Sequence, residues 1–216
     1  MPELGEIDRP VRLSVLGPLR VTVNGAPVDV GGRRQRSVLT RLAVAGGAVV
    51  SAHALVEDLW PGDPPQRALA ALQVQISHLR RVLEPDRRPR SPAAVLVSAA
   101  PGYALALDRV AVDSARFVGL VEQASGGEPQ EAAALLTEAL QLWSGPPFGE
   151  FTDDPWAAPE AARLTELRLV AVERLAEARL AVGAAHTAVP DLERLVHDHP
   201  FRESAVHLLA VALYRS

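Results

Sequence analysis

The sequence predicts a mostly α-helical protein with small antiparallel β-sheets toward its N-terminal end. Short runs of alternating Val and Leu occur before residue 31 and again at residues 95–107, which is typical of strands. Through most of the remaining chain, apolar residues recur at three- and four-residue spacing, which is typical of amphipathic helices. Hydrophobic residues make up 48% of the chain and aromatic residues only 4%, which fits an alanine- and leucine-rich helical protein.

The first segments predict strands followed by a helix. The run "VRLSVLGPLRVTVNGAPVDV" predicts short antiparallel strands joined at an Asn24-Gly25 turn. The run "GGRRQRSVLTRLAVAGG" predicts a helix from about Arg33 to Ala45, ended by two glycines.

Two further helices and a hairpin follow. Ser51 is a candidate N-cap for the helix "AHALVEDLW". The segment "PGDPPQ" ends that helix, and we expect Pro64 and Pro65 to lie in the first turn of the next one, which stops at Glu84. The run "VLVSAAPGYALAL" then predicts a β-hairpin. Strands, three helices and a hairpin are the order of a winged helix-turn-helix, in which the third helix is the candidate reader of DNA.

After Asp108 the chain predicts helices alone. Five runs with helical spacing are separated by "SGGEP", "SGPPFGEFTDDP" and "DHPF". We therefore expect an N-terminal tail over residues 1–10, a winged helix-turn-helix over residues 11–108, and an all-helical, tetratricopeptide-like domain over residues 109–216. Strict tetratricopeptide spacing is absent.

The net charge of −4 hides an asymmetry between the two halves. Residues 1–108 hold 13 arginines against 10 acidic residues, whereas residues 109–216 hold 9 arginines against 16. A basic segment joined to an acidic half indicates one part that meets a polyanion and another that does not.

Composition also excludes several classes of function. The chain has no cysteine, so disulfides and thiolate metal sites are excluded, and it has no lysine, so a P-loop or a lysine nucleophile is excluded. No catalytic spacing stands out, and we expect neither an enzyme nor a cofactor. The acidic N-terminus and the lack of a long apolar run predict a cytoplasmic protein without a membrane span. Two histidines in "HDHP", His197 and His199, lack a third ligand, so no metal site is expected.

The third helix has an unusual outer face. Leu69, Leu72, Ile76, Leu79 and Leu83 form an apolar stripe at helical spacing. The opposite face carries arginines and small residues, with no acid between Asp63 and Glu84. Such a face fits a major groove, where acids would be repelled by phosphates and small apolar groups meet thymine methyls. The alternative is an ordinary solvated helix back.

Several segments resemble one protein family. "LGPLRVTVNGAPVDVGGRRQRSVLTRLAV", "LVEDLWPGDPP", "LQVQISHLRRVLEP" and "PGYALAL" are similar to the OmpR-type winged helix, and more narrowly to the Streptomyces antibiotic regulatory protein (SARP) family of transcriptional activators. "AAALLTEALQLWSGPPFGEF", "RLTELRLVAVERLAEARLAVG" and "HPFRESAVHLLAVALYRS" resemble the bacterial transcriptional activation domain of that family. The resemblance runs in order from about Val11 to Ser216.

This resemblance implies a sequence-specific activator of secondary-metabolite genes. The family binds direct repeats near promoters as head-to-tail protomers and recruits RNA polymerase. In the family, a segment like "ALYRS" normally leads into "GR" and at least one more helix pair, which implies either a longer protein or a short activation domain. The runner-up function is a helical protein-interaction scaffold that binds no specific DNA sequence.

Individual residues then receive expected roles in DNA binding. The expected contacts to bases or phosphates are Arg33, Arg34, Arg36, Arg67, Gln73, Gln75, Ser77, His78, Arg80, Arg81 and Tyr103. Arginines at a helix N-terminus oppose the helix dipole unless an anion is near, and a phosphate would supply one. A solubilising turn is an equal alternative for the first three, and packing beneath the hairpin is an equal alternative for Tyr103. The family usually has arginine at the position of His78.

The loop "LWPGDPPQ" has a separate expected role. In OmpR-type activators this loop contacts RNA polymerase, and the resemblance assigns Trp60, Asp63 and Gln66 to that contact, with the sigma subunit as the expected partner. Its prolines reduce the entropy lost on docking. The alternative is a plain connector in which Trp60 fills the core.

Overall fold

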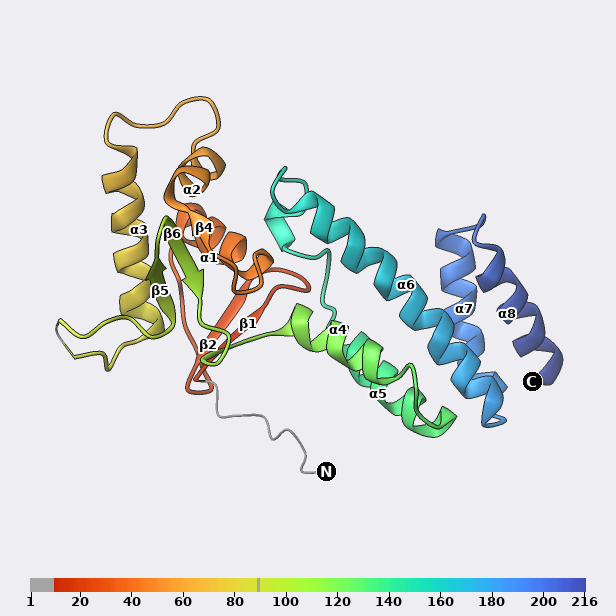
Figure 1. Ribbon diagram of the computed structural model, residues 1–216. Helices are drawn as coiled ribbons and strands as arrows, with labels where there is room; N and C mark the ends of the chain where they lie inside the picture. The colour runs from red at the N-terminus through yellow and green to blue at the C-terminus, as the bar shows by residue number, and fades with distance from the viewer. Residues whose placement is uncertain (1–9, 89) are drawn as a thin grey trace. The chain divides into compact units, whose positions relative to one another are not determined.

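The structure is a computed structural model that describes residues 10–88 and 90–216. These residues form eight α-helices and two small sheets (Figure 1), which confirms the predicted fold class. The predicted tail at residues 1–10 lies almost entirely outside the described residues. Within the described part of the chain, no helix is long and apolar enough to cross a membrane.

The chain divides into two compact units. The first comprises the residues up to Ala115 together with Gly145–Ala161, and the second comprises Arg116–Ser144 and Ala162–Ser216. The predicted boundary at Asp108 differs from this division for two physical reasons. Strand β7 (Val110–Val112) extends the first sheet beyond Asp108, and the segment 145–161 packs on the first unit rather than on the helices around it in sequence.

The first sheet has the strand order β3-β2-β1-β7. Strands β1 (Val11–Ser14), β2 (Arg20–Val23) and β3 (Ala26–Pro27) are antiparallel, whereas β7 is parallel to β1. The predicted turn is confirmed: Asn24 and Gly25 both have positive φ, at 50° and 80°, as a tight hairpin turn requires.

Three helices and a three-stranded sheet complete the first unit. Helix α1 (Arg33–Val44) is followed by β4 (Val50–Ser51), α2 (Ala52–Leu59) and α3 (Ala68–Leu83). Strands β5 (Leu96–Ala99) and β6 (Gly102–Leu105) form the predicted hairpin, and β6 also pairs with β4. The Ser51 side chain accepts a 3.0 Å hydrogen bond from the Ala54 N–H, which confirms it as the N-cap of α2.

Helix α3 begins later than predicted. Pro64 and Pro65 precede it, and Arg67 is its N-cap residue. All residues from Pro61 to Arg67 are exposed, so α2 and α3 are joined by a solvent-facing loop. Of the predicted apolar stripe, Leu72, Ile76, Leu79 and Leu83 are buried, but Leu69 is 58% exposed. Leu69 lies in the first turn of α3, next to that exposed loop, where no element covers it.

The segment 145–161 is anchored to the first unit by backbone and ring contacts. The Phe148 N–H donates to the Val15 carbonyl at 2.6 Å, and the Phe148 and Phe151 side chains are buried. Gly149, at the start of a short 3₁₀ turn (Gly149–Phe151), has a φ of 52° and approaches Pro18 so closely that a Cβ would stand 2.9 Å from the Pro18 Cα.

The second unit is all helical, as predicted. It contains most of α4 (Asp113–Gln123) and of α6 (Ala158–Ala181), whose first residues belong to the first unit, together with α5 (Pro129–Gln141), α7 (Ala185–Asp198) and α8 (Glu203–Arg215). Phe117 packs edge-on against Trp143 with ring centroids 5.2 Å apart. A buried cluster joins α6, α7 and α8 and consists of Ala176, Leu180, Ala185, Ala188, Leu192, Leu208 and Ala212.

Candidate nucleic-acid interface

The outer face of α3 is exposed and free of acidic residues. Gln73, Val74, Ser77 and Arg81 are exposed, and Val74 is 64% exposed although it is apolar. The inner face of the same helix carries the four buried side chains of the core. Helix α3 therefore presents small apolar, polar and cationic groups to solvent, which is the surface that a major groove accepts.

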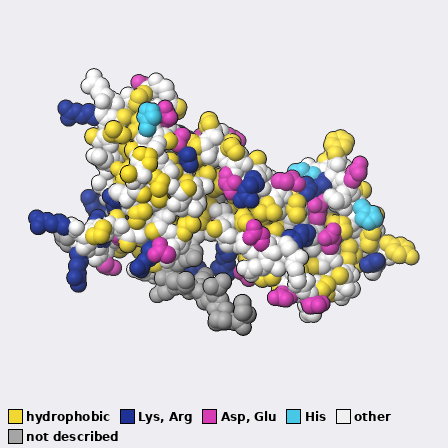
Figure 2. Space-filling view, viewed as in Figure 1, with side chains coloured by type: hydrophobic (Ala, Val, Ile, Leu, Met, Phe, Trp, Pro, Cys, Tyr) yellow, Lys and Arg dark blue, Asp and Glu magenta, His cyan; other side chains and the backbone are white. Residues whose placement is uncertain are grey.

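Basic residues surround the C-terminal end of α3. A hollow of about 290 Å³ is lined by Ser77, Arg80, Arg81, Glu84, Pro85 and Arg87. Figure 2 shows basic side chains projecting from the side of the first unit that carries α3 and the loop after it. This concentration of positive charge is what a phosphate backbone attracts.

Arg80 is bonded within the protein. Its Nε donates to the Leu96 carbonyl at 2.9 Å and its Nη2 donates to the Ser98 hydroxyl at 2.8 Å, so it joins α3 to strand β5 of the hairpin. Its guanidinium also lies 5.8 Å from the centre of the Tyr103 ring. Partial burial lowers the pKa of the Arg80 guanidinium. Arg80 therefore fixes the hairpin against α3, and Arg81, its neighbour, remains exposed.

Tyr103 is half-buried on β6 beneath Arg80. This arrangement matches the packing alternative for its ring and leaves its expected phosphate contact a prediction. The hairpin turn itself, Ala99 to Gly102, carries no basic side chain.

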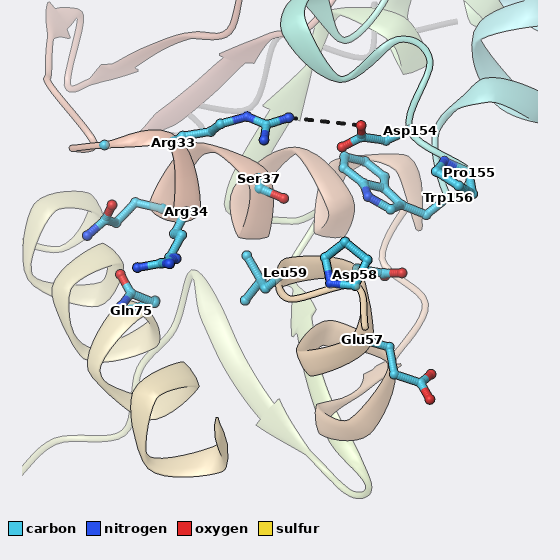
Figure 3. Close-up of a pocket in the computed structure, with 13 residues that line it drawn as sticks. Arg33, Arg34, Ser37, Glu57, Asp58, Leu59, Gln75, Asp154, Pro155 and Trp156 are labelled. Atoms are coloured by element: carbon cyan, nitrogen blue, oxygen red, sulfur yellow. Dashed lines mark ion pairs between the residues drawn. The ribbon is translucent and has the colours of Figure 1, made fainter. Parts of the chain in front are cut away.

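The arginines at the start of α1 lie beside carboxylates of the segment 145–161. The Arg36 Nε is 2.7 Å from the Glu150 carboxylate, and the Arg33 Nε is 3.5 Å from it. Arg33 also lies 4.0 Å from the Asp154 carboxylate (Figure 3). The anion that the helix dipole demands is thus present in the protein itself. Glu150 and Asp154 are not among the residues predicted from the sequence; the acidic run "GEFTDDP" was the only pattern that could have indicated them.

Arg34 differs from its two neighbours. Its guanidinium lies 5.5 Å from the centre of the Trp60 ring, and it forms no ion pair with any described residue. With Arg33, Gln35, Ser37, Asp58, Gln75 and Trp156 it helps to line a cleft of about 640 Å³ (Figure 3). Among the three, Arg34 has the cation most available to an outside anion.

Gln75 and His78 are half-buried on α3 and belong to its α1 side. The His78 Nε2 is buried without a hydrogen-bond partner among the described residues, and it lies 3.2 Å from the position that a Cβ on Gly31 would take. The Gln75 Oε1 is likewise buried and unpartnered within that part of the chain. Both groups therefore face away from the exposed surface formed by Gln73, Ser77 and Arg81.

The remaining predicted residues lie before and at the start of α3. Asp63, Gln66 and Arg67 are exposed, and Trp60 is half-buried at the end of α2. Gly62 has a φ of 79°, a conformation that favours glycine, and it forms the turn predicted here.

The described residues contain no group of three or more His, Asp or Glu side chains that could hold a metal ion. His197 and His199 are exposed near the end of α7.

Comparisons with known proteins match both parts of the chain to described families. Residues 28–105 match the family described as transcriptional regulatory protein, C terminal, and residues 112–216 match the bacterial transcriptional activator domain. Both the fold and the matched families define a class, that of winged-helix transcriptional regulators.

Full-length relatives narrow this class to one family. The chain is 38% identical over 94% of its length to the transcriptional regulatory protein MoaR1 of Mycobacterium tuberculosis, of which it spans 67%. It is 33% identical over 99% of its length to the transcriptional regulator RedD of Streptomyces coelicolor, of which it spans 62%. The chain belongs to the SARP family of transcriptional regulators, and these relatives are regulators rather than enzymes.

A solved structure supports the same conclusion. The chain superimposes on EmbR of Mycobacterium tuberculosis, determined in complex with a low-affinity phosphopeptide, with a TM-score of 0.83 and 33% sequence identity. The match covers 95% of this chain and 55% of that one. The chain therefore spans 55% to 67% of the length of these three relatives.

Proposed function

We propose that this protein activates transcription by placing α3 in the major groove at direct repeats beside a promoter. The observation that carries the proposal is the outer face of α3, which is exposed, acid-free and flanked by arginines. Gln73, Ser77 and Arg81 are the residues best placed to address base edges and phosphates. The family resemblance adds secondary-metabolite genes as the targets. The protein would act in the cytoplasm and would need no cofactor.

The other residues that were predicted to contact DNA have different roles in this proposal. Arg34 and Arg67 are exposed and serve as phosphate contacts. Arg80 acts as a positioning residue, because its donors already bond Leu96 and Ser98. Arg33 and Arg36 can contact phosphates only if they give up their ion pairs with Glu150. His78 and Gln75 influence base reading through the fit of α3 against α1.

A mobility-shift assay on genomic fragments at near-physiological salt tests sequence-specific binding. A specific regulator binds its own sites roughly a thousandfold or more tighter than other DNA. Equal and weak binding to every fragment would favour a helical protein-interaction scaffold instead.

Head-to-tail binding of two protomers has its own test. Heterologous packing predicts cooperative occupancy of a direct repeat and little dimer in free solution. Inserting about five base pairs between the repeats turns one protomer by half a helical turn and should abolish cooperativity. Equal affinity for one isolated half-site and for the pair would argue against this arrangement.

The exposed loop between α2 and α3 is the proposed contact with RNA polymerase and its sigma subunit. Asp63 and Gln66 project into solvent there, whereas Trp60 is held at the end of α2 beneath Arg34. Asp63→Arg combined with Gln66→Ala should leave the fold and the DNA affinity unchanged but reduce activation in a purified transcription assay. Full activation by this variant would place the polymerase contact elsewhere on the protein.

A further inference from the structure

A groove runs along α6 in the second unit, between α5 and α7. Its volume is about 470 Å³. The apolar part of its lining comes from all three helices and consists of Leu140, Leu169, Val172, Leu175 and Leu195. Leu175 and Leu195 are buried and the others are half-buried, so the floor of the groove is apolar and partly open to solvent.

The groove follows one stripe of α6. Thr165, Leu169, Val172 and Arg179 recur at helical spacing on this stripe and all line the groove. From Thr165 to Arg179 the stripe is roughly 21 Å long, at about 1.5 Å of rise per residue. That length matches about four turns of a second helix lying along α6.

One cation of the groove has no acidic partner. The Arg168 guanidinium lies over the Trp143 ring, 4.9 Å from its centre, and forms no ion pair with a described residue. Partial burial lowers its pKa, and the positive charge of Arg194 on α7 lowers it further. Arg168 and Arg194 thus place two like charges on the lining of one groove, and of the two only Arg194 is bonded to a carboxylate, that of Asp191.

The carboxylates of the groove leave its lining with an excess of positive charge. Arg179 and Arg194 both bond the same carboxylate, that of Asp191, at 2.9 and 2.8 Å. The groove is lined by three arginines and two aspartates, whereas the second unit as a whole contains 8 arginines and 11 acidic residues. Positive charge is thus concentrated in the groove of an otherwise acidic unit.

We propose that this groove docks an amphipathic, acidic helical segment of a partner protein. Apolar side chains of that segment lie on the leucine floor, and a carboxylate between Arg168 and Arg194 relieves their repulsion. A helix that lays its apolar face into a groove is a common mode of peptide recognition. The charges at the rim of the groove favour a helix of opposite charge. Helices of the second unit alone form this site, and the proposal does not depend on the proposed DNA binding.

A labelled synthetic peptide tests the proposal on the whole chain. The probe is a helix of about 14 residues with Leu at three- and four-residue spacing and Glu at the positions between, measured by fluorescence anisotropy. We expect binding that weakens roughly tenfold in Arg168→Glu, because one attractive pair becomes a repulsive one. Arg168→Ala should weaken it by a smaller factor.

Arg215→Glu on α8 is the matched control, since it makes the same charge change outside the groove. An equal loss of peptide affinity in Arg215→Glu and Arg168→Glu would mean that only the net charge of the protein matters. Equal affinity for a peptide with Gln in place of every Glu would mean that the peptide binds through its apolar side chains alone. Either result overturns the proposal, and so does the absence of peptide binding. Thermal unfolding of each variant checks the fold. A mobility shift with Arg168→Glu should match that of the unaltered protein, which separates this proposal from the DNA-binding one.

Discussion

Helices α3 and α6 are the longest of their respective units, and they use charge in opposite ways. Between Ala68 and Leu83, α3 carries two arginines and no acid. Between Ala158 and Ala181, α6 carries four arginines and four glutamates. Several charges of α6 are bonded to other helices, for example Glu173 to Arg202 and Arg179 to Asp191. Charge on α6 mainly holds the second unit together, whereas the exposed Arg81 of α3 remains available for the proposed contact with DNA.

Within α3 the same contrast recurs between adjacent residues. Arg80 is used up in bonds to the hairpin, and Arg81 points to solvent. The number of arginines on a helix is therefore a poor measure of its contacts to DNA; their partners within the protein decide which of them remain available.

The largest effect is expected from breaking the charge network of α6. Glu173 accepts hydrogen bonds from Arg202 and Ser204 and is buried. Glu173→Ala removes one partner of a mostly buried pair and should lower the free energy of unfolding by about 3 kcal/mol at neutral pH. Chemical denaturation measures this loss of stability. Under conditions in which the variant remains folded, its affinity for DNA should stay unchanged.

The same pair predicts a pH dependence. Burial alone raises the pKa of the Glu173 carboxyl, but hydrogen bonds from Arg202 and Ser204 and the charge of Arg202 outweigh it, and the pKa is lowered. The stabilisation is therefore complete above the unfolded-state pKa of about 4.3 and is lost as the pH falls through the folded-state value. Glu173→Gln should show a weaker loss of stability with acid than the unaltered protein; parallel curves would contradict this.

Adding an acidic residue to the outer face of α3 should remove the acid-free surface that distinguishes α3 from α6. Ser77→Glu places a carboxylate against phosphates and should weaken specific DNA binding roughly a hundredfold, since like charges at an interface cost several kcal/mol. Ala162→Glu, at an exposed position of α6, is the control and should change the affinity little. Equal losses from both variants would show that net charge alone governs binding.

A smaller effect is expected where α3 contacts the α1 side. Gly31 has a φ of 99°, and a Cβ there would lie 3.2 Å from the His78 Nε2 and 3.3 Å from the Gln35 Cδ. Gly31→Ala should therefore lower the free energy of unfolding by about 1–2 kcal/mol. Gly62→Ala makes the same change at a φ of 79° with nothing within 4 Å, so the difference between the two variants reports mainly on the contact.

The smallest effect separates Arg80 from Arg81. A phosphate contact contributes a slope of roughly −0.9 to log K against log salt. Arg81→Ala should flatten the slope of DNA binding by about one unit, whereas Arg80→Ala should leave the slope unchanged while lowering the stability of the hairpin by about 1 kcal/mol. A flatter salt dependence of DNA binding in Arg80→Ala would show that Arg80 contacts a phosphate after all.

Local patterns predicted most of the fold, because helices, caps and turns depend on neighbouring residues. The Ser51 cap, the Asn24-Gly25 turn and the five later helices follow from such spacing. Leu69 was assigned to the core because periodicity does not show where covering elements end. Partners distant in sequence were not predictable either: Arg36 and Glu150 lie 114 residues apart, and the bonds of Arg80 depend on how the hairpin folds back.

The central claim is that the outer face of α3 enters the DNA major groove. The chain has no cysteine, so Ser77→Cys creates a single attachment point for a DNA-cleaving reagent. With the reagent at residue 77, the account predicts cleavage confined to one major-groove position in each half-site of the direct repeat. The same reagent on Ala162→Cys should cleave weakly and without that pattern. Strong, localised cleavage from residue 162 and none from residue 77 would contradict the account.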